Sequence, residues 1–173
     1  MLEPHFFVPH PLVQFRRAER YVKRLRDGYE GRELVRAAEN MEWEDDMYST
    51  FIHIHHIKDW FSGTASNEAA RTYAKANVDL KRCAWIANLW KHSKPDRNVP
   101  ARVGRLPTLL TITVTNVPST DRPPTQRYPF VFEFSDGRTE VFESLVLAER
   151  GLKAWDVFIA DAVAQGQLSP LAG

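Results

Sequence analysis

The chain has 173 residues, of which 43% are hydrophobic and 12% aromatic. This is enough apolar material for one sizeable core, and it excludes wholesale disorder. The net charge of +1 gives no overall attraction to nucleic acid or to an acidic membrane. A single cysteine, Cys83, excludes an intramolecular disulfide framework and a cysteine-based zinc finger.

Helical patterns fill the first half of the chain. Apolar residues recur at helical spacing from residue 12, which predicts a first helix, and Gly28 is expected to end it. A second helix is predicted over about 32–61, with a break near Asn40, and its later part is apolar on several sides, as is typical of a buried helix. A third is predicted over about 67–92, and a helix-start pattern indicates an interruption near Asn77.

Strand patterns follow in the second half. Residues 110–115, 128–134 and 138–142 alternate between apolar and polar or charged side chains, which predicts three strands with one buried face each. Asp-Gly at 136–137 predicts a tight turn between the last two strands. An amphipathic helix is predicted over 145–164.

This order of elements predicts an α+β fold: an N-terminal bundle of about three helices, a small antiparallel β-meander and a C-terminal helix. We expect one domain over 1–173, with a helical half at 12–94 and the meander plus last helix at 107–173. No stretch is long and apolar enough to span a bilayer, and the N-terminal segment lacks the pattern of a secretory signal. We therefore expect a cytoplasmic protein without a membrane partner.

Polar and titratable side chains stand out within two otherwise apolar helical segments, 53–60 and 83–92. Buried polar groups cost free energy unless they are paired, so these side chains need either partners or a function. Helical spacing places the early histidines and the aspartate close together along their helix. The candidate site residues are His53, His56, Asp59, Asn88, Lys91 and His92.

One interpretation of these residues is acid–base catalysis without a metal. His56 or His92 would titrate near neutrality, and Asp59 would orient an imidazole. Asn88 or Lys91 would hold an anionic group. RNA phosphodiester cleavage is one reaction that such a combination would support.

A second interpretation is a metal-dependent hydrolase. His53, His56, Asp59 and His92 would bind a divalent transition metal through imidazole and carboxylate ligands. The spacing is not a recognised zinc signature, because the chain has no His-Glu-x-x-His motif.

A third interpretation is a paired polar network that fixes the register of a helix pair in a non-catalytic structural or interaction module. Asp59 would then pair with a neighbouring cation such as Lys58 or Arg82. Trp85 and Trp90 would pack in the core rather than stack on bases.

The segments 55–60 and 83–92 resemble a pattern of uncharacterised bacterial proteins, in which a His-rich helix ending in Lys-Asp-Trp precedes a helix ending in Asn-x-x-Lys-His. That pattern is similar to the HEPN superfamily, helical domains often associated with RNA cleavage in toxin and defence systems. The resemblance covers about 41–94, within the helical half, and implies an RNA-related, stress-related or defence-related role. The arginine that HEPN ribonucleases carry shortly before the histidine is absent, since Trp85, Ile86 and Ala87 occupy those positions.

The first helix is strongly basic, and the segment after it is acidic. The basic residues are Arg16, Arg17, Arg20, Lys23, Arg24 and Arg26, and the acidic ones are Glu39, Glu42, Glu44, Asp45 and Asp46. A basic stripe can follow a phosphate backbone, which makes RNA a candidate partner. We favour mutual neutralisation of the two segments, within the fold or across a homodimer.

Overall fold

The computed structural model describes residues 10–29, 40–91, 129–133 and 139–169. The elements in these residues are α1 (Pro11–Tyr29), α2 (Asn40–His56), the 3-10 helix η2 (Ile57–Phe61), α3 (Asn67–Ala76), α4 (Val78–Lys91), β1 (Pro129–Glu133), β2 (Thr139–Glu143) and α5 (Ser144–Ala164). Among the described helices, none is long and apolar enough to cross a membrane.

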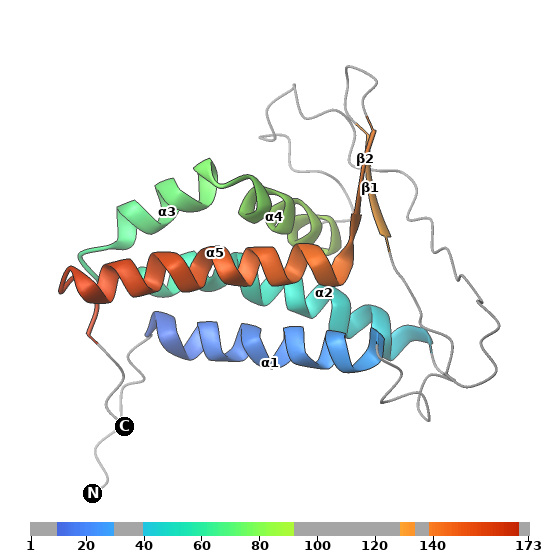
Figure 1. Ribbon diagram of the computed structural model, residues 1–173, viewed down its shortest axis with the longest axis horizontal. Helices are drawn as coiled ribbons and strands as arrows, with labels where there is room; N and C mark the ends of the chain where they lie inside the picture. The colour runs from blue at the N-terminus through green and yellow to red at the C-terminus, as the bar shows by residue number, and fades with distance from the viewer. Residues whose placement is uncertain (1–9, 30–39, 92–128, 134–138, 170–173) are drawn as a thin grey trace, which may run out of the picture.

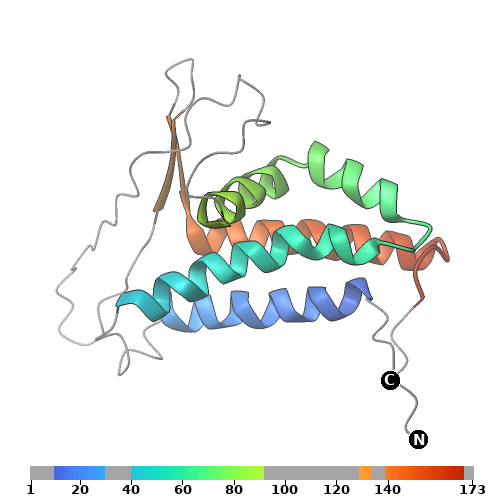
Figure 2. The same cartoon turned by 180° about the vertical axis from the view of Figure 1, so that it is seen from behind.

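The helices pack as one bundle around α5. In Figure 1, α5 runs across the middle of the molecule, α1 lies along one side of it, and α3 and α4 arch over the other side. Seen from behind in Figure 2, α2 lies between α1 and the α3–α4 arch. Because α2 contacts α1, α4 and α5, the C-terminal helix shares its core with the N-terminal helices.

The core is centred on α2 and on the facing side of α5. Phe51 and Ile54 of α2 are fully buried, and Trp155 of α5 is almost fully buried. The indole N–H of Trp155 donates a hydrogen bond of 3.0 Å to the carbonyl oxygen of Ile54. Phe61 stacks on the same indole, with ring centroids 6.1 Å apart. The described side chains leave no buried polar nitrogen or oxygen atom without a hydrogen-bond partner.

Local sequence signals explain where the second and third predicted helices end or break. The second helix tightens into η2 and stops at Ser62, followed by Gly63 with a φ of 83°, so the predicted end of this helix at residue 61 is confirmed. The predicted break at Asn77 is also confirmed: its side-chain oxygen accepts hydrogen bonds of 3.0 Å from the Asp79 N–H and 3.1 Å from the Leu80 N–H. The side chain of Asn77 therefore caps α4.

The predicted α+β class is wrong. The described chain is mostly helical, and the C-terminal helix lies inside the helical bundle. Strand structure in the described residues is limited to the short antiparallel contact of β1 with β2, in which Val131 lies opposite Val141, so they contain no meander. Alternation identifies short extended segments, but it does not reveal that α5 packs on helices instead of on a sheet. The expected strand at 110–115 and the turn at 136–137 lie outside the described residues.

Candidate anion-binding site

Asp59 lies at the centre of a small group of positively charged or titratable side chains. His56 Nδ1 is 2.7 Å from its Oδ2, and Lys58 Nζ donates to both of its carboxylate oxygens at 2.8 and 2.9 Å. Arg71 Nη2 of α3 is 3.8 Å from its Oδ1. Arg82, a candidate partner of Asp59 in the sequence analysis, instead pairs with Asp79 and Glu140.

The protonation state of Asp59 follows from these contacts. Burial raises the pKa of its carboxyl, but hydrogen bonds from Lys58 and His56 lower the pKa more, so it lies below the usual value. Asp59 is therefore ionised at neutral pH. It orients the His56 imidazole by accepting a hydrogen bond from it.

His53 serves the packing of α2 on α1. The side-chain amide of Gln14 donates to His53 Nδ1 and to the His53 carbonyl oxygen, both at 3.1 Å. The imidazole also lies against Tyr21, with ring centroids 4.4 Å apart. Burial, and then the positive charges of Arg17 and His56, lower the pKa of His53 from 6.5 to about 4. The ring is neutral at pH 7 and joins two helices.

This pKa predicts a pH-dependent stability. The unfolded chain takes up a proton on His53 at higher pH than the folded chain does. The contribution of the neutral His53 ring to the free energy of unfolding is therefore complete above pH 6.5, and it is lost as the pH falls to about 4. Because the ring is half exposed, solvent screens its interactions, and we expect the loss of stability to be about 1–2 kcal/mol. Urea denaturation between pH 4 and 7 should give a steeper loss of stability for the native chain than for His53→Gln. Parallel curves for the two proteins would contradict the assignment.

The predicted metal ligands do not converge in the described part of the chain. It holds no group of three or more His, Cys, Asp or Glu side chains that could bind a metal ion. His53 Nδ1 faces Gln14 on α1, whereas His56 Nδ1, at the end of α2, faces Asp59 of the adjoining η2. His92 and the side chain of Lys91 lie outside the described residues.

A cavity of about 260 Å³ opens beside this group, between the end of α2 with η2, and α3 and α4. It is lined by His55, Lys58, Arg71, Ala74, Lys75, Leu80, Lys81, Ala84, Trp85, Asn88 and Trp155. Of the predicted site residues, Asn88 lines the cavity. Asp59 and its partner His56 are adjacent to it, because Asp59 pairs with the lining residues Lys58 and Arg71. Trp85 is half buried and forms part of the wall.

The cavity is positively charged. Among the described residues that line it, four carry a cationic side chain and none is acidic. Lys58 and Arg71 share the adjacent Asp59, while Lys75 and Lys81 form no ion pair with any described residue. Arg71 and Lys75 are also four residues apart on α3, a spacing at which like charges destabilise a helix by about 0.2–0.5 kcal/mol. A bound anion would relieve this repulsion.

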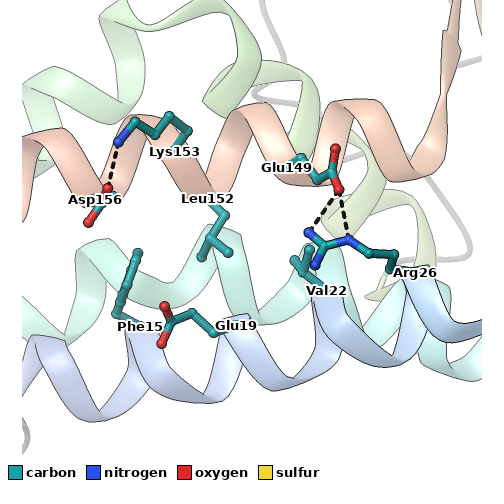
Figure 3. A pocket seen from close by; sticks show the side chains of 8 residues that line it. All are labelled: Phe15, Glu19, Val22, Arg26, Glu149, Leu152, Lys153 and Asp156. Atoms are coloured by element: carbon teal, nitrogen blue, oxygen red, sulfur yellow. Dashed lines mark hydrogen bonds and ion pairs between the residues drawn. The ribbon is translucent and has the colours of Figure 1, made fainter.

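A second hollow, of about 420 Å³, lies between α1 and α5 and differs in charge (Figure 3). Its charged side chains are already matched: Arg26 pairs with Glu149 at 2.9 Å, and Lys153 pairs with Asp156 at 2.8 Å. Leu152 lies between these pairs in the view. Since its cations have carboxylate partners, this hollow offers much less attraction to an anion.

The basic residues of α1 divide into two groups. Arg24 pairs with Asp46 of α2 at 2.8 Å, so at this pair the acidic segment neutralises a basic residue of α1 within the same chain. Arg16 and Lys23 pair with carboxylates of α1 itself. Arg17 and Arg20 form no ion pair with a described carboxylate. These two arginines therefore remain available to an external anion.

Comparisons with protein-family models, with curated proteins and with solved structures found no match. The resemblance to the HEPN superfamily accordingly stays a prediction.

Proposed function

We propose that this protein binds the phosphate of a nucleotide, either free or at the end of a nucleic acid, in the cavity between η2, α3 and α4. The observation that carries the proposal is the described lining of the cavity, whose residues include four cationic side chains and no carboxylate. Lysine and arginine are the side chains that proteins use to hold phosphate groups. The predicted RNA-related role is consistent with a ligand of this kind.

The apolar wall of the cavity favours a nucleotide over a simple anion. Leu80, Ala84 and Trp85 provide a surface for a flat ring, and the Asn88 amide supplies both a hydrogen-bond donor and an acceptor for polar edges. The volume of about 260 Å³ lies just below the roughly 300–1,000 Å³ range of small-molecule pockets. It therefore suits one nucleotide unit better than a dinucleotide cofactor.

The proposal concerns binding and assigns no cleavage. His56, the nearest residue of the predicted acid–base set, lies outside the cavity lining, and its Nδ1 is occupied by Asp59. Asp59 also offsets part of the charge of Lys58 and Arg71. Lys75 and Lys81, which have no carboxylate partner among the described residues, are expected to supply most of the attraction for phosphate.

Isothermal titration calorimetry with adenosine monophosphate, adenosine and inorganic phosphate tests this proposal. We expect the monophosphate to bind more tightly than adenosine or inorganic phosphate, because only it engages both the cations and the apolar wall. Neutralising Lys75 and Lys81 together (Lys75→Gln with Lys81→Gln) should weaken binding at least about tenfold, since a charge-assisted hydrogen bond contributes roughly 1.5–3 kcal/mol.

Lys153→Gln is the matched control, because Lys153 is an exposed lysine of α5 in the other hollow. It should leave the affinity unchanged. Equal binding of adenosine and its monophosphate, or full affinity in the Lys75/Lys81 double variant, would refute the proposal.

A further inference from the structure

We propose that the natural ligand is a single-stranded nucleic acid, whose end occupies the cavity and whose following nucleotides cross the outward face of α2 and η2 to Arg17 and Arg20 of α1. This inference rests on the proposed function, because the path begins in the cavity. It adds a second binding surface on another helix.

The helices that carry the two surfaces lie on either side of α2 (Figure 2). Figure 2 shows α2 between α1 and the α3–α4 arch on the face turned to the viewer. Both α1 and α3 contact η2, so this short helix joins the two surfaces. His56 and Asp59, with side chains about one third exposed (35% and 37%), lie at this junction. A strand leaving the cavity therefore reaches α1 by crossing η2.

The distal end of this path carries two arginines that no described carboxylate neutralises. The Arg17 guanidinium lies over the ring of Trp60 of η2, 5.5 Å from the ring centroid, and its Nη1 donates to Gln14. Arg20 follows one turn later and is exposed. Neither forms an ion pair with a described carboxylate, unlike Arg16 on the same helix.

The middle of the path is nearly neutral. Asp59 is already bound by Lys58 and His56, so its charge presents only a weak barrier to phosphate. The path thus has a cationic cavity at one end, a paired carboxylate in the middle and two arginines at the other end. A single strand fits this pattern because it carries a phosphate at every nucleotide and a flat base that the apolar wall can cover.

Affinity as a function of strand length tests the inference with the intact protein. Fluorescence anisotropy would compare a labelled mononucleotide with RNA and DNA strands of two, four and about eight nucleotides, at several salt concentrations. We expect affinity to rise with length until the strand reaches α1. Arg17→Gln with Arg20→Gln should then weaken the longest strand about tenfold and lower its salt slope by about 1.4, since each phosphate contact contributes about 0.7 for single strands. The RNA and DNA arms identify which nucleic acid is preferred.

Two controls keep this test specific. Arg16→Gln with Lys23→Gln removes the same number of charges from α1, but these residues are already paired, so it should have much less effect on the longest strand. Arg17→Gln with Arg20→Gln should bind the mononucleotide like the native protein, because both residues lie outside the cavity lining.

The outcomes separate the two proposals. If the mononucleotide binds but longer strands bind no more tightly, or if the Arg17/Arg20 double variant keeps the native salt slope, the path is refuted and the cavity proposal stands. Equal binding of an acidic peptide of matched charge also refutes the path. If the mononucleotide does not bind at all, the cavity proposal fails, and the path fails with it.

Discussion

Trp155→Ala should lower the free energy of unfolding by about 3–5 kcal/mol, the range observed when a buried aromatic side chain is deleted from a core. Trp155 is 1% exposed and contacts aromatic rings from η2, α3 and its own helix. The substitution opens a cavity where α2 and α5 meet, and it removes the hydrogen bond to the Ile54 carbonyl. Chemical denaturation followed by far-ultraviolet circular dichroism gives the change without relying on tryptophan fluorescence.

Two further variants identify the cause of this loss. Trp155→Phe keeps an aromatic ring but deletes the indole N–H, so we expect a smaller loss of about 1–3 kcal/mol. Val157→Ala alters a side chain of the same helix that is 45% exposed and should change stability by less than about 0.5 kcal/mol. A loss below 1 kcal/mol for Trp155→Ala would show that the bundle is not centred on this contact.

Gly151→Val should lower the free energy of unfolding by about 3 kcal/mol, at the upper end of the cost of overpacking a core. Gly151 is buried in α5, where a Cβ atom would lie 2.7 Å from Cys83 Sγ and 3.2 Å from Ile54 Cγ2. Both distances are shorter than ordinary van der Waals contacts, so α4 or α2 must move away from α5. Calorimetric or chemical denaturation measures the effect.

A double-mutant cycle tests whether the contact with Cys83 is responsible. Gly151→Ala alone should be destabilising, even though alanine favours a helix by about 1 kcal/mol over glycine. Adding Cys83→Ala removes the sulfur, so the two changes should couple favourably by more than about 0.5 kcal/mol. Ala160→Val, at an exposed position of the same helix, is the control for valine in α5 and should cost less than about 1 kcal/mol. Additive effects of Gly151→Ala and Cys83→Ala would contradict the close approach.

The positions of the described helices were largely predictable, because their signals are local. The apolar spacing of α1, the Gly63 stop and the cap at Asn77 each depend on neighbouring residues. The fold class was not predictable in this way, because it depends on which element α5 packs against. Its apolar face fits a sheet or a helix bundle equally well in sequence, and Trp155 binds a carbonyl of α2, a hundred residues earlier in the chain.

The candidate site was predicted only in part. The contact of His56 with Asp59 spans one helical turn, and spacing alone indicates it. Lys75 and Lys81, in contrast, are ordinary surface lysines in the sequence, and only the bend at Asn77 brings α3 and α4 around one cavity. The one feature of the sequence that indicated a positively charged site was the pair of like charges, Arg71 and Lys75, four residues apart on one helix.

The central claim is that the cavity between η2, α3 and α4 binds a nucleotide phosphate, and a nuclear magnetic resonance titration tests its location most directly. Adenosine monophosphate should shift the side-chain amide signal of Asn88 and the indole signal of Trp85, both of which line the cavity. The side-chain amide of Gln14, which is bonded to His53 between α1 and α2, should stay in place. Unshifted Asn88 and Trp85 signals at saturating nucleotide, or shifts confined to the hollow between α1 and α5, would contradict the account.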